Sequence, residues 1–207
     1  MSAEYWKQPA RWNVRAMREG RRFKVFCASI ADVFDNQVDP AWRADLWRVI
    51  GETPNLDWLL LTKRPQNIAG MLPGGWGAGW PNVWMGTSVE NQQEANRRIP
   101  YLELVPAVMH FLSAEPLLEY FDANYIGIDW VIVGGESGPG ARETNLGDID
   151  RLVRNLIDAG VFVFVKQLGS NLVGSYRGGM DRIRLKDPKG GDPMEWPQDL
   201  QVREFPR

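Results

Sequence analysis

Six short apolar runs recur along this chain, and each is followed at once by polar or charged residues. Strands of a parallel sheet are covered by helices on both faces, so they are typically continuous apolar runs rather than alternating ones. Each run is therefore predicted to be a buried parallel strand with polar residues at its carboxyl end. The six runs are Phe23–Cys27, Asp57–Leu61, Val83–Gly86, Met109–Leu112, Asp129–Val133 and Phe162–Val165.

Helical patterns separate these runs. Asp39 followed by Pro40 is an N-cap and first-turn proline, and it predicts a helix that stops at Gly51. Residues at helical spacing on this helix are predicted to be core, namely Trp42, Leu46, Val49 and Ile50. Other helices are predicted from Pro9 to Gly20, from near Gln66, before Pro100, and from Asp148 to Gly160.

Strands that alternate with helices form βαβ units with right-handed crossovers. The predicted fold class is therefore α/β, with a parallel (β/α) barrel-like sheet that is incomplete at about six units, since a full barrel has eight. A doubly wound open sheet is the alternative. The predicted division is an α/β domain over residues 1–169 and an irregular C-terminal extension over residues 170–207, packed on it through Trp196 and Phe205. The Gly- and Trp-rich segment MLPGGWGAGWP is either a lid or a packing loop.

Composition narrows the class of protein. The chain has 207 residues and a net charge of -2, which favours neither a polyanion-binding protein nor a strongly acidic one. Its single cysteine, Cys27, cannot form an intrachain disulfide or a cysteine-based metal site, and no metal site is predicted. No apolar stretch is long enough to span a bilayer and the start is no signal peptide, so we expect a cytoplasmic location and no membrane partner.

The sharpest local signal is the segment VIVGGESGPG. Gly134 and Gly135 follow a buried strand, where they free amide donors and let another group approach the backbone closely. Glu136 comes next, and Glu115 ends the preceding strand in the same way. Carboxylates at these positions are suited to hold an amine, a ribose hydroxyl or a metal; the alternative is a tight turn with a solvated Glu136. The spacing is not that of the dinucleotide-binding fingerprint.

Basic residues follow other runs. Lys63 and Arg64 come after the second run and Lys166 after the last, and such cations bind phosphate or carboxylate. The alternative for Lys166 is a structural ion pair with Glu115 or Glu136. The predicted catalytic residues are Glu115, Glu136 and Lys166. The predicted ligand-binding residues are Ser29, Asp32, Thr62, Lys63, Arg64, Ser88, Glu90, Gly134, Gly135 and Gln167.

Two further residues of reactive type are predicted to be structural. His110 is the single histidine and lies inside an apolar run, so we expect a packed neutral imidazole rather than a catalytic base. Cys27 closes a strand and is expected to act as a small buried apolar residue rather than as a nucleophile.

Several segments, taken in order, resemble a widespread family of bacteriophage and prophage proteins of uncharacterised function. They are VFCASIADVFDNQVDPAWRADLW, DWLLLTKRPQNI, PNVWMGTSVENQQEANRRIP, FLSAEPLL, DWVIVGGESGPGAR, VFVKQLG and KGGDPMEWPQDLQVREFP. The resemblance implies a barrel-like α/β fold. Longer members carry an N-terminal cysteine triplet similar to the 4Fe-4S ligand set of radical S-adenosylmethionine enzymes, in which a Gly-Gly-Glu segment holds the methionine amine.

This chain departs from the longer members because it lacks the triplet, and Cys27 is not one of the three cysteines. No cofactor is therefore expected for this chain alone. S-adenosylmethionine and a 4Fe-4S cluster are expected of longer members, and radical chemistry is expected here if a cysteine segment is supplied.

The leading hypothesis is a small polar or anionic ligand bound at the strand carboxyl ends. The alternative is a non-enzymatic module that binds nucleic acid or protein through the basic N-terminal helix. That segment contains Lys7, Arg11, Arg15, Arg18, Arg21 and Arg22. A third hypothesis is a glycosidase-like barrel that uses Glu115 and Glu136.

Overall fold

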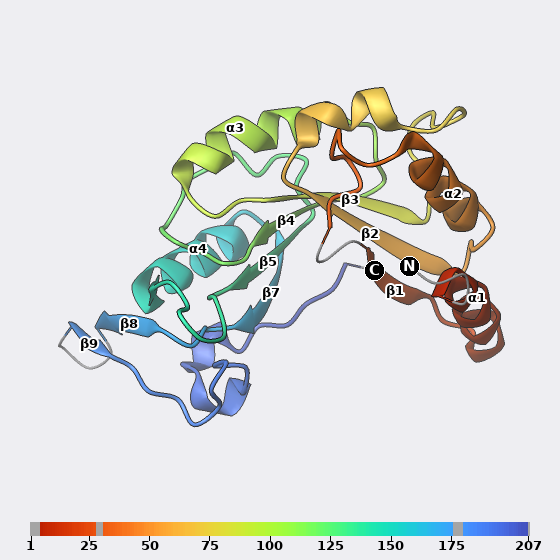
Figure 1. The fold of residues 1–207 in the computed structure, drawn as a ribbon. Coiled ribbons are helices and arrows are strands. Elements are labelled where there is room, and N and C mark those ends of the chain that lie inside the picture. The colour runs from red at the N-terminus through yellow and green to blue at the C-terminus, as the bar shows by residue number, and fades with distance from the viewer. Residues whose placement is uncertain (1–4, 28–30, 176–179, 207) are drawn as a thin grey trace. The chain divides into compact units, whose positions relative to one another are not determined.

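The computed structural model describes residues 5–27, 31–175 and 180–206 of the chain (Figure 1). A six-stranded sheet has the strand order β1-β2-β3-β4-β5-β7, and a three-stranded sheet has the order β6-β8-β9. The chain divides into two compact units. Unit 1 comprises Met1–Thr87 and Tyr101–His110, and unit 2 comprises Ser88–Pro100 and Phe111–Arg207.

All six predicted strands are present, each at or within two residues of its predicted bounds. They are β1 (Phe23–Cys27), β2 (Leu56–Thr62), β3 (Val83–Ser88), β4 (His110–Ala114), β5 (Trp130–Gly134) and β7 (Phe162–Gln167). The registers of β1 with β2, β2 with β3, β4 with β5 and β5 with β7 are parallel. The strand order follows the chain order, as in a (β/α) barrel, whereas a doubly wound sheet reverses at a switch point. The incomplete barrel-type α/β fold is therefore confirmed.

Two helices of unit 1 begin and end close to where their signals predict. Helix α1 spans Gln8–Glu19, and Gly20 ends it in the left-handed conformation at φ 62°. Helix α2 spans Pro40–Gly51, and the Asp39 carboxylate caps it by accepting a hydrogen bond from the Ala41 amide (2.9 Å).

The buried face of α2 includes Val49 and Ile50, as predicted, but differs from the prediction at Trp42. Trp42 is 66% exposed, whereas Arg43 and Trp47 are buried. Arg43 is satisfied inside because its guanidinium donates to the Val33 carbonyl (3.0 Å), and the Trp47 indole donates to the Met71 carbonyl (3.1 Å). The prediction for Trp42 was wrong because hydrophobicity alone cannot show that an arginine is held by backbone carbonyls.

The Gly- and Trp-rich segment after β2 is a packing loop. Trp76 is buried, and its ring lies 5.7 Å from that of Trp47; Trp80 lies 5.9 Å from Trp47. The predicted helix near Gln66 was wrong, since two short 3-10 turns, Pro65–Asn67 and Ala69–Met71, occupy that place.

The remaining helices are α3 (Gln92–Glu103) and α4 (Leu146–Asp158). Helix α3 runs through Pro100, so the prediction that it ends before that proline was wrong. Helix α4 is capped by Asn145 rather than started by Asp148, and it contacts β5 and β7, as Figure 1 shows. Among the described residues, no helix combines the length and apolar character that a membrane crossing requires.

The C-terminal segment contains regular structure that its sequence did not predict. Strands β8 (Leu172–Ser175) and β9 (Met180–Arg182) form the second sheet with β6 (Thr144–Asn145). Trp196 is buried, and the ring of Phe205 lies 5.0 Å from that of Phe164, so both aromatic anchors pack as expected. The division at residue 169 stays a prediction.

Candidate functional site

Three strands of unit 2 carry the candidate site at their carboxyl ends. Phe111 of β4 lies opposite Trp130 of β5, which lies opposite Phe162 of β7. The ring of Trp130 lies 5.8 Å from that of Phe111 and 6.2 Å from that of Phe164, so these aromatics share one face of the sheet. Side chains alternate between the two faces of a strand, which places Glu115 on this aromatic face directly after β4.

Lys166 reaches Glu115 from the end of β7. Its Nζ lies 2.6 Å from Oε1 of Glu115, and the two side chains are 51% and 21% exposed. The register of β5 with β7 shifts so that Val133 lies opposite Val165 and Gly134 opposite Gln167, which makes Lys166 the extra residue of a β-bulge. Bulges re-aim side chains at sheet ends. The structural ion pair is therefore confirmed, with Glu115 as the partner.

The two glycines at the end of β5 have different roles. A Cβ on Gly134 would lie 3.2 Å from the Gln167 carbonyl oxygen and 3.6 Å from Cγ of both Glu115 and Gln167, so this glycine lets those groups approach with no side chain between them. A Cβ on Gly135 would lie 2.3 Å from the Leu168 carbonyl oxygen. The close backbone approach that the glycine pair predicts is therefore made, at Gly135, by the chain's own backbone.

Glu136 bonds within its own loop. Its Oε2 accepts hydrogen bonds from the backbone amide and the Nε of Arg142, both at 2.8 Å. These hydrogen bonds hold the pKa of Glu136 below the ordinary carboxyl value, and the same contact raises the pKa of Arg142. Glu136 is therefore an ionised carboxylate that stabilises the loop after β5 through its bonds to Arg142.

Glu90 and its neighbours form a buried structural cluster. Oε2 of Glu90 accepts from Nη1 of Arg98 at 2.7 Å, and both side chains are less than a tenth exposed. The same nitrogen donates to the Ser88 carbonyl (2.8 Å). Gln167 is likewise engaged, because its amide donates to the Gly135 carbonyl (2.9 Å). These predicted ligand-binding residues all have bonds within the fold.

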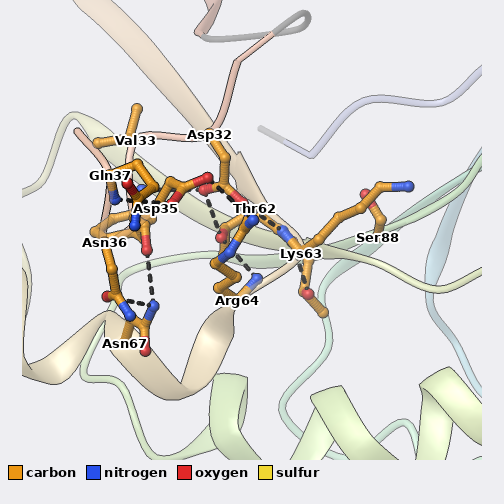
Figure 2. Close-up of polar contacts among 12 residues, drawn as sticks. Asp32, Val33, Asp35, Asn36, Gln37, Thr62, Lys63, Arg64, Asn67 and Ser88 are labelled. Atoms are coloured by element: carbon orange, nitrogen blue, oxygen red, sulfur yellow. Dashed lines mark hydrogen bonds and ion pairs between the residues drawn. The ribbon is translucent and has the colours of Figure 1, made fainter.

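A second strand-end cluster lies in unit 1, around Asp32 (Figure 2). Its carboxylate accepts from the Thr62 hydroxyl (2.7 Å) and from Nη1 of Arg64 (3.0 Å). It also accepts from the backbone amides of Lys63 and Phe34, both at 3.0 Å. Four donors thus converge on one carboxylate whose side chain is 14% exposed. We call this group, with Asp35, the Asp32 network.

Arg64 is fixed by two carboxylates in this network. Nη1 lies 3.0 Å from Oδ2 of Asp32 and Nη2 lies 3.0 Å from Oδ2 of Asp35. The three labelled residues lie side by side in Figure 2. A guanidinium held by two acids is already neutralised, so it has less attraction for a ligand phosphate. Lys63 is exposed at the same strand end and joins the network through its backbone amide.

Residues of reactive type are inert or structural where they are described. Burial raises the pKa of the Cys27 thiol to about 11, which keeps it protonated at neutral pH. The His110 ring nitrogen Nε2 lies 2.8 Å from the Val105 carbonyl, in line with a packed imidazole. Within residues 5–27, 31–175 and 180–206, no group of three His, Cys, Asp or Glu side chains is placed to hold a metal ion.

The structure thus brings Glu115 together with Lys166, and Asp32 together with Thr62 and Arg64. Ser29 lies outside the described residues. Sequence reasoning missed Arg142 and Asp35 as partners. Arg142 lies six residues after Glu136 in the same loop, and a search for oppositely charged neighbours would have found it.

The sequence was compared with known proteins. No curated protein and no solved structure matches the chain. Residues 1–190 match a family described as a protein of unknown function, DUF5131. Because this match covers most of the 207 residues, the chain belongs to the DUF5131 family of unknown function.

Proposed function

We propose that this protein binds a small polar ligand at the carboxyl ends of β4, β5 and β7. The observation that carries the proposal is the pair of Glu115 and Lys166, joined at 2.6 Å with half of the lysine side chain exposed. An ion pair this exposed contributes about 0.2–1 kcal/mol, so a ligand can replace it at little cost. The two charges are then available for groups of opposite sign.

The chemistry of the pair defines the ligand class. Glu115 is suited to accept hydrogen bonds from an amine or hydroxyl, and Lys166 to bind a carboxylate or phosphate. A ligand with both groups, such as one ending in an amino-acid moiety, matches the pair. Gly134 adds no side chain between Glu115 and Gln167.

We also propose a relation to phage and prophage proteins of the radical S-adenosylmethionine type. The sequence segments from VFCASIAD to VFVKQLG, which occur in the same order as in those proteins, support this relation. S-adenosylmethionine carries the amino-acid moiety that the pair would bind. The residues present do not fit a 4Fe-4S cluster, because Cys27 is the single cysteine and its thiol stays protonated. No step of the proposal passes through a cluster, and catalytic roles for Glu115, Glu136 and Lys166 stay predictions.

The proposal is tested by calorimetric titration of S-adenosylmethionine, and separately of methionine, into the purified chain. Glu115→Gln and Lys166→Met should each weaken binding at least tenfold, because one hydrogen bond to a charged group contributes about 1.5–3 kcal/mol and tenfold corresponds to about 1.4 kcal/mol. Asp150→Asn is the matched control, since Asp150 forms an ion pair with Arg154 on the exposed side of α4. Binding that survives both site substitutions, or no binding of either probe, would contradict the proposal.

A further inference from the structure

Four cationic side chains form one stripe along α1 in unit 1. Lys7 is the N-cap residue, and three arginines follow at intervals of four, four and three residues. At 3.6 residues per turn these positions fall within an arc of about 80°, over a length of about 16 Å. All four side chains are exposed. The α1 cation stripe consists of Lys7, Arg11, Arg15 and Arg18.

The opposite side of α1 is the one that packs on unit 1. Pro9 and Ala16 are its buried residues. Oδ1 of Asn13 accepts a hydrogen bond from the Asn55 amide (2.8 Å), which ties the helix to the turn before β2. Ala16 lies roughly 140° around the helix from the centre of the stripe. The cations therefore point away from the packed side of α1.

The N-terminal part of the stripe, Lys7 and Arg11, works against the stability of the helix that carries it. Like charges at spacings of three and four residues repel one another, and cations near a helix N-terminus oppose the helix dipole. The first turn of α1 contains no acidic residue, and Lys7 makes no side-chain cap. Residues selected for stability would have the opposite sign here, so this arrangement points to binding.

The local charge is large compared with that of the whole chain. Residues 7–22 contain six cations and one acid, Glu19, which gives a net charge of +5 in a chain whose net charge is -2. Part of this charge is used internally, since Arg15 and Arg21 contact Glu19, Arg22 contacts Asp57, and Lys7 and Arg11 also have interactions of their own. The side chain of Arg15 stays 68% exposed in its contact.

We propose that the α1 cation stripe binds the phosphate backbone of a nucleic acid without reading its sequence. A duplex carries one negative charge per about 1.7 Å of axis, so a 16 Å stripe faces about ten of them. A membrane-surface helix would instead need its apolar side free. The packed side of α1 is covered, and its exposed apolar residues do not form one face, because Trp12 lies on one side of the stripe and Val14 and Met17 on the other.

The test is fluorescence anisotropy with a labelled 20-base-pair DNA duplex and its single strand, between about 50 and 300 mM salt. Four phosphate contacts predict a slope of about 3.6 in log Kd against log salt for the duplex. Arg11→Gln combined with Arg18→Gln should lower that slope by about 2 and weaken binding at least tenfold at low salt. Glutamine keeps helix propensity, and circular dichroism verifies that the variant folds.

The matched control combines Arg97→Gln with Arg154→Gln. Both arginines are exposed on other helices, at 58% and 63%. The control should bind as the unmodified protein does. Absent binding, a slope that the stripe variant does not change, or preferential binding to anionic vesicles would each overturn the proposal. The assay contains no small ligand, so its result is independent of the Glu115 and Lys166 proposal.

Discussion

The two strand-end clusters of this protein use similar residues in different ways. In unit 1, the Asp32 carboxylate receives four hydrogen bonds, and Arg64 is held between two acids. In unit 2, Glu115 and Lys166 meet in one contact, with half of the lysine exposed. A saturated carboxylate stabilises a loop, whereas a weakly held pair is available to a ligand. Position at a strand end is therefore not enough to identify a site; the number of internal partners must be counted.

The difference has a local cause in the backbone. Asp32 precedes α2 in the chain and lies beside the carboxyl end of β2, so its carboxylate accepts from the backbone amides of both Phe34 and Lys63. After β5, Gly134 places no side chain beside Glu115, and the bulge in β7 aims Lys166 toward it. The first arrangement fills the acceptor positions of the carboxylate, and the second leaves most of them for solvent or ligand.

The largest effect is expected from the backbone that supports the pair in unit 2. In Gly135→Ala, the new Cβ would overlap the Leu168 carbonyl oxygen at 2.3 Å and crowd Oγ1 of Thr144 at 2.7 Å. Overpacking of this kind should lower the free energy of unfolding by about 3 kcal/mol, measured by urea denaturation. Gly74→Ala is the control, because its Cβ would meet nothing within 4 Å. Equal stability of the two variants would refute the close packing at Gly135.

The next largest effect on stability is expected at Asp32, compared with an acidic residue at the surface. Asp32→Ala leaves the Thr62 hydroxyl and two backbone amides without their acceptor and leaves Arg64 with Asp35 alone, which should cost about 2 kcal/mol in urea denaturation. Asp45→Ala, at an exposed i,i+3 contact with Arg48, should cost about 0.5 kcal/mol or less. A cost for Asp32→Ala no greater than that of the control would mean that the Asp32 network does not stabilise unit 1.

A smaller effect is expected at the open pair. Glu115→Gln should change the free energy of unfolding by less than about 1 kcal/mol, since half of the partner lysine side chain is exposed to solvent. The same variant should still lose ligand binding. A large loss of stability would place Glu115 with the saturated carboxylates and remove the basis of the comparison.

The smallest expected effect is the pH dependence of stability that comes from the ion pair of Glu136 with Arg142. Hydrogen bonds from Arg142 hold the pKa of Glu136 below its ordinary value in the folded protein, so the pair stabilises the fold at pH values above the pKa of the unfolded chain. The contribution is lost as the pH falls through the lowered folded pKa. Glu136→Gln should therefore be slightly less stable than the unmodified protein at pH 7 and should equal it in strong acid. A difference that is constant with pH would contradict the assigned titration.

The strands could be predicted because a strand that is buried on both faces appears in the sequence as a continuous apolar run. The bulge at Lys166 was not, since a shift of one residue between paired strands leaves no mark in the sequence. The same is true of Trp42 and Arg43, whose exposure depends on which carbonyls the loop presents. Strands as short as β6 carry too few residues for any periodic pattern.

The candidate site was predictable as a set of residues but not as a set of contacts. Glu115 and Lys166 were identified from their places after apolar runs, and an ion pair between them was one of two alternatives for Lys166. The sequence did not show whether Glu115 or Glu136 is the partner of Lys166, because that depends on the loop in which Glu136 bonds to Arg142. The conformation of a loop determines which residue a long side chain contacts, and that conformation could not be predicted from the sequence pattern.

The central claim is that the open pair, rather than the saturated network, meets the ligand. Backbone amide shifts of the isotope-labelled full chain, followed by NMR during titration with S-adenosylmethionine, test it directly. We predict that the amides of Glu115, Gly134 and Lys166 shift in a saturable way, while those of Lys63 and Arg64 stay in place. Saturable shifts confined to Lys63 and Arg64, or no shifts at all, would contradict the account.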